Sequence, residues 1–475
     1  MGWHDVSFHG SDQIQTPNID LLAFTGVAFR RYYSCASCTP SRSALLTGKF
    51  PHRLNMQGYP LSMSENRGIP TDEVLLSQYV KKAGYKTHLV GKWHVGASKD
   101  DYLPTERGFD SHFGHRGGYI DYYEYTLEEK ISNETVCGLH LFKNKTAAWD
   151  VSGYITDVYN DEAISVIKNH DTSSPLFLMV AHNAPHSGDD CSLLQAPQET
   201  VRSMRHITLS SRRTYGAMVK KLDDSVGDIF KAIYDKGIIN NTIIVFVSDN
   251  GGMTTGSHQN FASNYPLRGI KMTPFEGGIR VNGLIWSTSL NNTNHFWDGY
   301  MHVSDWLPTL LSAAGLEVPS GIDGVNQWDN INNNLNSSRS VFYEIDDYTG
   351  YASIIYGDYK LITSNVTISS GTYQGSELHG INGEPPSYEE TLTKSVAYNV
   401  LTSLNISVSY DVREKLVVNC TTTSDTICMP KNDVVCLYNI IEDPCETTDL
   451  SNTYPDLVST MKSLLNEEYE KRIPR

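Results

Sequence analysis

Apolar runs alternate with helix-like segments along much of the chain. The clearest runs, at 86–90, 175–181 and 242–248, have the length and composition of buried strands. Strands that alternate with helices predict an α/β fold built on a mostly parallel sheet. A polar cluster follows each run. Because ligands of such sheets bind beyond the carboxyl ends of the strands, we expect the three clusters to contribute to one site.

The three polar clusters contain residue types that bind ions. Lys92 and His94 follow the first strand, His186 follows the second, and Asp249 and Asn250 follow the third. Carboxylate and amide oxygens are hard ligands that suit Ca²⁺ or Mg²⁺. Taken alone, each cluster is equally typical of a solvated loop or of an Asx turn. Only their combination favours a functional site.

A helix is predicted to begin near Cys38. Thr39 can cap it, Pro40 suits its first turn, and Gly48 can end it. The thiol of Cys38 then lies at a helix N-terminus, where unpaired N–H groups attract anions and lower a thiol pKa. Arg42 shares its face of the helix. These residues also fit a buried or disulfide-bonded cysteine beside an ordinary helix.

Two later segments differ in their predicted roles. The glycine-rich stretch 264–280 is basic and carries Lys271, so it is suited to an oxyanion, although a solvated loop has the same composition. The stretch 302–311 predicts a helix with a polar start. We expect His302 and Asp305 in that stretch to be structural.

The chain has 475 residues, enough for more than one domain. We expect an α/β domain at 1–345 and a smaller domain at 346–475. In the smaller domain, 351–363 predicts antiparallel strands and 456–472 an amphipathic helix. The asparagine-rich segment 328–338 is expected to be a loop that leads to the boundary.

Charge narrows the classes of ligand. The chain has 38 basic and 54 acidic residues, a net charge of -16, which argues against general nucleic-acid binding. An anionic substrate would need a local basic pocket. No apolar run reaches the length that spans a membrane.

Sequons and cysteines favour the secretory pathway. Acceptor sequons occur at Asn133, Asn144, Asn240, Asn291, Asn336, Asn365, Asn405 and Asn419. Cysteines cluster near the C-terminus as two expected short-loop disulfides of open connectivity, at Cys420, Cys428, Cys436 and Cys445. The first ten residues lack the features of a signal peptide, so either a signal lies upstream or the secretory interpretation is wrong. We expect a lysosomal or extracellular protein.

Taken together, the short motifs resemble the type I sulfatases in order and approximate spacing. They are Cys38-Thr-Pro-Ser-Arg42, Gly91-Lys-Trp-His94, Asp249-Asn-Gly-Gly252 and Pro-Leu-Arg-Gly-x-Lys271. The sequence segments that flank these motifs, at 16–29, 103–114 and 302–310, also look like this family. Within it they look most like the arylsulfatase B branch, whose substrate class is N-acetylgalactosamine 4-sulfate in glycosaminoglycans. The resemblance implies an alkaline-phosphatase-like α/β sheet between helices, with a smaller C-terminal α+β domain.

The resemblance also implies the chemistry of Cys38. In the family this cysteine is oxidised in the endoplasmic reticulum by the formylglycine-generating enzyme. The hydrate of the resulting formylglycine is the nucleophile that attacks the sulfate ester. Pro40 and Arg42 match positions that the modifying enzyme reads, and Arg42 is expected to orient the nucleophile.

Other site residues take their expected roles from the same resemblance. Asp249 and Asn250, with the modified Cys38, match ligands of a Ca²⁺ ion. Lys92 and Lys271 match lysines that bind the sulfate group. The remaining matches are His94, which lies beside the formylglycine hydrate in the family, and His186, the acid for the leaving oxygen.

One departure affects the expected activity. Sulfatases carry an Asp-Asp pair at the end of a first strand, just before the phrase that begins here at Gly2. The resemblance therefore implies that this chain lacks a strand and two metal ligands, for which His4 and Asp5 are not assumed to substitute. We expect the chain as given to be a poor catalyst.

Three alternatives belong to other classes. A cysteine-dependent phosphatase would use the Cys38 thiolate directly, but its loop normally spaces cysteine and arginine more widely. A non-catalytic binder of sulfated glycans would keep the pocket without a complete metal site. The pair Cys35-x-x-Cys38 could suggest zinc, which would need two further ligands at suitable spacing.

Overall fold

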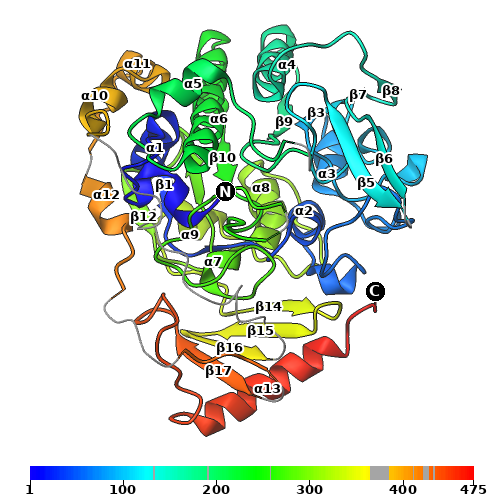
Figure 1. Ribbon diagram of the computed structural model, residues 1–475, viewed down its shortest axis with the longest axis vertical. Helices are drawn as coiled ribbons and strands as arrows, with labels where there is room; N and C mark the ends of the chain where they lie inside the picture. Colours follow the sequence, from blue (N-terminus) through cyan, green and yellow to red (C-terminus); the bar gives the residue numbers. More distant parts are fainter. Residues whose placement is uncertain are drawn as a thin grey trace.

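Helices surround two larger β-sheets in the larger part of the molecule, which also contains two two-stranded sheets, and a four-stranded sheet with one long helix forms its lower end (Figure 1). The computed structural model describes residues 1–474 except 132–133, 190–191, 257, 364–383, 410, 421–426 and 432–433. Among these residues no helix is long and apolar enough to cross a membrane.

The elements have the following bounds. The helices are α1 (Pro17–Thr25), α2 (Cys38–Thr47), α3 (Leu76–Lys82), α4 (Ile155–Asn169), α5 (Gln198–Ser203), α6 (Ser210–Asp235), α7 (Glu276–Ile279), α8 (Trp306–Ala313), α9 (Trp328–Asn332), α10 (Tyr388–Thr393), α11 (Val396–Ser403), α12 (Asp411–Leu416) and α13 (Pro455–Tyr469). The strands are β1 (Val27–Phe29), β2 (Tyr32–Tyr33), β3 (Lys86–Gly91), β4 (Ser111–Gly114), β5 (Thr126–Ile131), β6 (Glu134–Leu139), β7 (Phe142–Lys143), β8 (Thr146–Ala147), β9 (Leu176–Ala181), β10 (Ile244–Val247), β11 (Gly283–Trp286), β12 (His295–Trp297), β13 (Met301–His302), β14 (Val341–Asp346), β15 (Tyr351–Tyr356), β16 (Tyr359–Thr363) and β17 (Val435–Asn439).

The three predicted strands are confirmed as β3, β9 and β10, and the α/β class is confirmed with them. The expected single, mostly parallel sheet is replaced by two mixed sheets, ordered β8-β7-β4-β3-β9 and β10-β11-β1-β12. Strand β3 runs parallel to β4 and β9. Strand β11, however, runs antiparallel to both β10 and β1, which makes the second sheet mixed.

Strands β9 and β10 each have one open edge. Among the described residues, β9 pairs only with β3 and β10 only with β11. Their apolar residues at 176–180 and 244–247 are half-buried, whereas all four residues of β11 are buried. The two strands that lead to His186 and Asp249 are therefore the less covered ones.

The C-terminal part contains a four-stranded antiparallel sheet, β14-β15-β16-β17. The hairpin β15–β16 falls at the predicted 351–363. Helix α13 packs Met461 and Leu465 against Ile354 and Leu361 of this sheet, as its apolar face predicts. The asparagine-rich segment is partly wrong as a loop, because α9 begins there at Trp328 and buries Ile331.

The division at residue 345 stays a proposal. Helices α10 to α12 belong to the later stretch, yet they lie beside α1 in the larger part (Figure 1). Leu392 and Leu401 join the core that contains Ile19 and Phe24 of α1. The chain thus returns to the larger part before it completes the C-terminal sheet with β17.

The predicted disulfides are Cys420–Cys445 and Cys428–Cys436. The second closes a short loop, and the first encloses it with a sequence separation of 25. Both lie in the chain that leads into and out of β17.

Candidate active site

Helix α2 places Cys38 at its first position. Ser37 precedes it with extended backbone, so the predicted cap at Thr39 is wrong. The Thr39 hydroxyl instead donates to the His94 carbonyl oxygen at 3.0 Å, which ties the helix start to the loop after β3. The predicted end is confirmed, because Gly48 closes α2 at a φ of 69°.

The predicted residues converge around the Cys38 thiol. Its Sγ lies 3.2 Å from Lys271 Nζ and 3.3 Å from Asn250 Oδ1. The same Lys271 ammonium lies 3.3 Å from His186 Nε2. Loops that follow β9 and β10, together with the loop before α7, therefore meet at the start of α2.

Arg42 connects this cluster to the ends of two strands. Its Nε donates to Asp249 Oδ2 at 3.0 Å, and Nη2 lies 3.0 Å from the same oxygen. Its Nη1 donates to the Lys92 carbonyl oxygen at 3.1 Å. Arg42 is thus held by the ends of β3 and β10, on the face of α2 that also presents Cys38.

The cations dominate the electrostatics of the thiol. Burial alone raises the pKa of Cys38, but the ammonium groups of Lys271 and Lys92 outweigh it. The contacts of the two site histidines with the thiol act in the same direction, and the pKa of Cys38 falls well below its ordinary value. Burial also lowers the pKa of Lys92, to about 8. The pocket therefore favours an anion at the position of Sγ.

Both site histidines are neutral in this arrangement. Burial, followed by the Lys271 charge, lowers the pKa of His186 to about 4. Its Nδ1 lies 2.9 Å from the Ser187 carbonyl oxygen, so that nitrogen carries the proton and Nε2 faces Lys271. His94 is held similarly, with Nε2 2.7 Å from the Leu61 carbonyl oxygen.

The described residues do not form a complete Ca²⁺ site. They contain no group of three or more His, Cys, Asp or Glu side chains placed to hold a metal. Asp249 and Asn250 supply two side-chain groups with one negative charge, whereas Ca²⁺ takes six to eight oxygens. Moreover, Arg42 already occupies Asp249 Oδ2.

Asp5 does not complete the site. Its carboxylate lies 2.6 Å from Arg212 Nη1 and accepts a 2.5 Å hydrogen bond from the Tyr215 hydroxyl. It also accepts from the backbone N–H of Ser263 at 3.0 Å. These contacts use the carboxylate to hold the N-terminal segment on α6.

A rim of rings lies beside His186: its Tyr119 begins the tyrosine-rich stretch 119–125, which in sequence fits packing and a substrate rim equally, and its His258 was missed by sequence reasoning. The Tyr119 ring lies parallel to the His186 ring, with centroids 6.1 Å apart, and the His258 ring lies 5.1 Å from Tyr119. The sequence feature that points to this rim is the pair Gly117-Gly118 directly before Tyr119. Paired glycines allow other side chains to approach the backbone closely.

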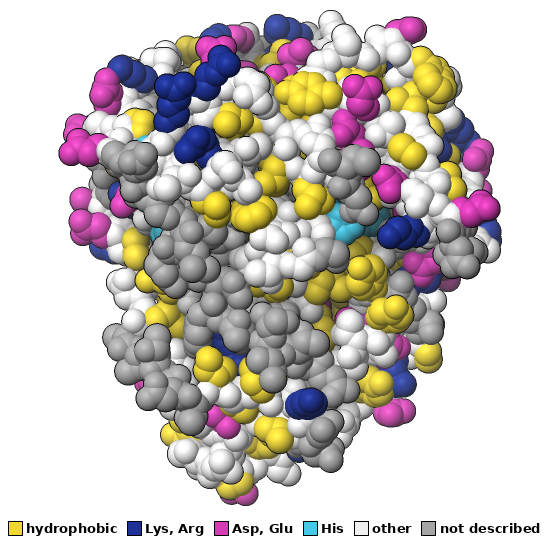
Figure 2. All heavy atoms as spheres, in the orientation of Figure 1, with side chains coloured by type: hydrophobic (Ala, Val, Ile, Leu, Met, Phe, Trp, Pro, Cys, Tyr) yellow, Lys and Arg dark blue, Asp and Glu magenta, His cyan; other side chains and the backbone are white. Residues whose placement is uncertain are grey.

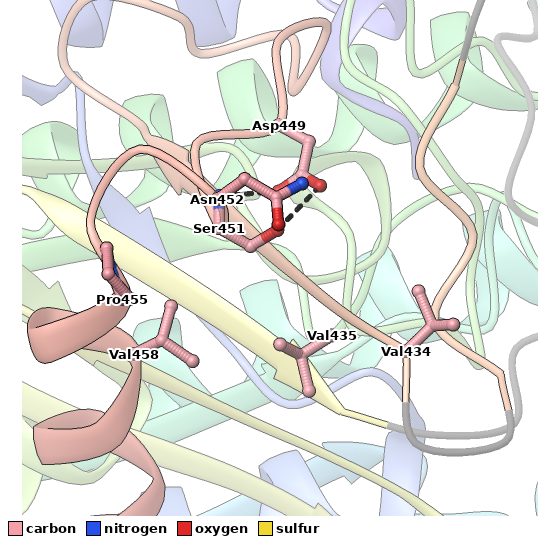
Figure 3. Close-up of a pocket in the computed structure, with 7 residues that line it drawn as sticks. All are labelled: Val434, Val435, Asp449, Ser451, Asn452, Pro455 and Val458. Atoms are coloured by element: carbon pink, nitrogen blue, oxygen red, sulfur yellow. Dashed lines mark hydrogen bonds between the residues drawn. The ribbon is translucent and has the colours of Figure 1, made fainter.

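A separate hollow of about 330 Å³ lies between β17 and the start of α13. Figure 3 shows Val435 and Val458 on its floor and Asp449 with Ser451 at its edge. Asp449 accepts hydrogen bonds from the backbone N–H groups of Leu437 and Ser451. Its carboxylate therefore has a structural role, and the residues that line the hollow include no lysine, arginine, histidine or cysteine.

The comparisons with known proteins agree with the site. The family model described as Sulfatase matches residues 1–316. Arylsulfatase J of Mus musculus is 34% identical over 496 residues, covering 100% of this chain and 75% of that protein. N-acetylgalactosamine-6-sulfatase of Homo sapiens is 32% identical over 359 residues, covering 72% and 66%.

A solved structure gives the same result. The crystal structure of Ps i-CgsB in complex with k-i-k-neocarrahexaose matches with a TM-score of 0.77 at 27% identity, over 100% of this chain and 91% of that one. The chain belongs to the sulfatase family. Its alkaline-phosphatase-like fold is confirmed, and the relatives named above are sulfatases, which hydrolyse sulfate esters.

Proposed function

We propose that the protein hydrolyses sulfate esters through a formylglycine derived from Cys38 by the formylglycine-generating enzyme. The observation that carries this proposal is the set of cations around Cys38 at the start of α2. Lys271 contacts the sulfur, and Lys92 and Arg42 lie beside it. Such a set stabilises charge that develops on a sulfate group.

Each residue has a distinct part in the proposed reaction. The hydrate of formylglycine would supply one oxygen to attack the sulfur and a second to release sulfate. Lys92 and Lys271 neutralise the sulfate oxygens. His186 presents Nε2 to the pocket, where the negative charge of the bound sulfate ester would favour its protonation and so prepare an acid for the leaving alcohol. Arg42 holds Asp249 and orients the start of α2.

Sulfated glycans are the proposed substrate class, with a glycosaminoglycan that carries N-acetylgalactosamine 4-sulfate as the first candidate. The relative named N-acetylgalactosamine-6-sulfatase supports a sulfated N-acetylgalactosamine. The assignment to the arylsulfatase B branch rests on the sequence phrases given above.

The proposed compartment is the secretory pathway, with a lysosomal or extracellular destination. Six predicted acceptors are exposed: Asn144, Asn240, Asn291, Asn336, Asn405 and Asn419. Asn133 and Asn365 lie outside the described residues. The two disulfides support the same oxidising compartment.

Turnover of an aryl sulfate by protein secreted from cells with the modifying enzyme tests the function. We expect activity that Cys38→Ala abolishes, since the nucleophile is lost. Cys35→Ala is the matched control, because Cys35 is buried in the same turn and Glu344 and burial raise its pKa. Equal turnover by wild type and Cys38→Ala would refute the proposal.

The incomplete set of metal ligands favours a second candidate, a non-catalytic binder of sulfated glycans. In that case the three cations hold the sulfate group and no ester is cleaved. Calorimetry would show binding of a sulfated sugar, while the aryl sulfate assay would show no turnover. Turnover that depends on Cys38 would eliminate this candidate.

A further inference from the structure

We propose that Tyr119 and His258 form a sugar-binding platform that selects a sulfated pyranose over other sulfate esters. This inference rests on the proposed function and adds a specificity determinant to it. The three rings of Tyr119, His186 and His258 are half-buried and lie beside one another at the mouth of the Cys38 pocket. In the view of Figure 2, histidine side chains reach the surface next to hydrophobic side chains.

The rings of Tyr119, His186 and His258 lie close to one another and form what we call the wall. Tyr119 and His186 are parallel within 2°, while His258 is inclined by 50° to Tyr119. His258 also lies 6.3 Å from His186. A sulfate held by Lys271 would therefore place its sugar ring next to His186 and against this wall.

The loop of Tyr119 is fixed by the catalytic region. The backbone N–H of Gly117 donates to His140 Nε2 at 2.8 Å, and the N–H of His94 donates to the Arg116 carbonyl oxygen at 3.1 Å. A Cβ on Gly118 would lie 2.9 Å from the His94 ring, so only glycine allows this approach. The Tyr119 hydroxyl donates to the Glu128 carbonyl oxygen, which fixes its ring further.

The loop of His258 is fixed to the turn that carries His186. Asn260 Nδ2 donates to the Pro185 carbonyl oxygen at 3.0 Å, directly before His186. The backbone N–H of Asn260 donates to the Met253 carbonyl oxygen at 3.0 Å, which closes the loop. Both sides of the wall are thus anchored to the site that holds the sulfate.

The chemistry of the wall suits a sugar. An aromatic ring offers a flat apolar surface with polar edges, and a pyranose presents apolar C–H groups on one face and hydroxyls at its rim. Inorganic sulfate needs only the cations. The platform should therefore add affinity for the sugar part of a substrate without changing the affinity for sulfate itself.

Isothermal calorimetry with two probes tests this assignment. The probes are N-acetylgalactosamine 4-sulfate and inorganic sulfate. We expect Tyr119→Ala and His258→Ala each to weaken binding of the sugar about tenfold and to leave sulfate affinity within about twofold. Tyr119→Phe keeps the ring and should retain the sugar affinity. Tyr454→Ala is the matched control, since Tyr454 pairs with Tyr359 in the C-terminal part.

The outcomes separate the two proposals. Binding of neither probe by wild type would refute the proposed function. Wild-type binding of both probes with unchanged sugar affinity in folded Tyr119→Ala and His258→Ala would overturn the platform alone. An equal loss for both probes would also overturn it, because the rings would then act on the sulfate pocket. Thermal melts establish that each variant is folded.

Discussion

Two buried clusters of charged side chains in this molecule differ in their balance of positive and negative charge. The first, which we call the latch, joins Lys360 of β16 to Glu276 of α7 and Glu446 before α13, at 3.0 and 2.9 Å. Arg280 lies 3.5 Å from Glu276. In the Cys38 pocket, by contrast, three cations face a single carboxylate, that of Asp249.

The contrast indicates which cluster is built for stability. In the latch each carboxylate meets a cation, and the carboxylates of Glu276 and Glu446 are fully or almost fully buried. The latch thereby ties the C-terminal sheet to the larger part. The pocket is left with uncompensated positive charge, which costs stability and favours an anionic ligand.

The largest expected effect comes from breaking the latch. Lys360→Met would remove the cation that Glu276 and Glu446 share and leave only Arg280 beside Glu276, so unfolding should become easier by about 3–5 kcal/mol. Urea denaturation measures the change, and Lys394→Met in an exposed pair is the control. A loss below about 1 kcal/mol would show that the latch does not stabilise the fold.

Removal of a pocket cation should affect catalysis rather than stability. Lys271→Ala, in a protein extended by the strand that sulfatases carry before Gly2, should lower turnover of an aryl sulfate about a hundredfold. Lys92→Ala and His186→Ala should act similarly. The surface variant Lys231→Ala serves as control. Near wild-type turnover by a folded variant would exclude that residue from the site.

The same extension tests the metal site. A strand that ends in two aspartates before Gly2 should add carboxylates near Asp249 and Asn250, because the Met1 carbonyl oxygen lies 3.4 Å from the hydroxyl of Ser248, directly before Asp249. Ca²⁺ at about a hundred times its Kd should then stabilise the extended protein by about 2.7 kcal/mol. The 475-residue chain should gain much less. Equal Ca²⁺-dependent shifts in Tm would contradict the two-ligand description.

The smallest effect concerns the thiol of unmodified protein. Because Lys271 and Lys92 lower the pKa of Cys38, its thiolate absorbance should develop below the ordinary thiol pKa of about 8.5. Lys271→Met should move that step upward, because the Lys271 ammonium is the largest of the influences that lower the pKa. Cys38→Ala should remove this rise in thiolate absorbance, which assigns it to the Cys38 thiol. A step at the ordinary pKa in wild type would contradict the charge imbalance.

The sequence predicted much of this arrangement because local patterns carry it. The strands at β3, β9 and β10 follow from apolar runs, and their polar ends predicted that Lys92 and Asp249 would meet. The mixed pairing through β11 could not be predicted, because strand direction depends on contacts distant in the chain. The packing of α10 to α12 against the larger part could not be predicted for the same reason.

The residues of the candidate site were likewise predicted only in part from the sequence. Motif spacing brought Cys38, Arg42 and Lys271 into one prediction. The role of Asp5 as a partner of Arg212 depends on α6, more than two hundred residues away. The Tyr119 rim depends on His94 and His140 packing against paired glycines. Such contacts leave little local signal in a single sequence.

Mass spectrometry of the peptide that contains Cys38 tests the central claim most directly. Protein secreted from cells that contain the formylglycine-generating enzyme should carry formylglycine at residue 38 and cysteine at Cys35. A peptide that holds only unmodified Cys38, or a Cys35–Cys38 disulfide, would contradict the account, because the cations of the pocket would then surround a cysteine that is never converted.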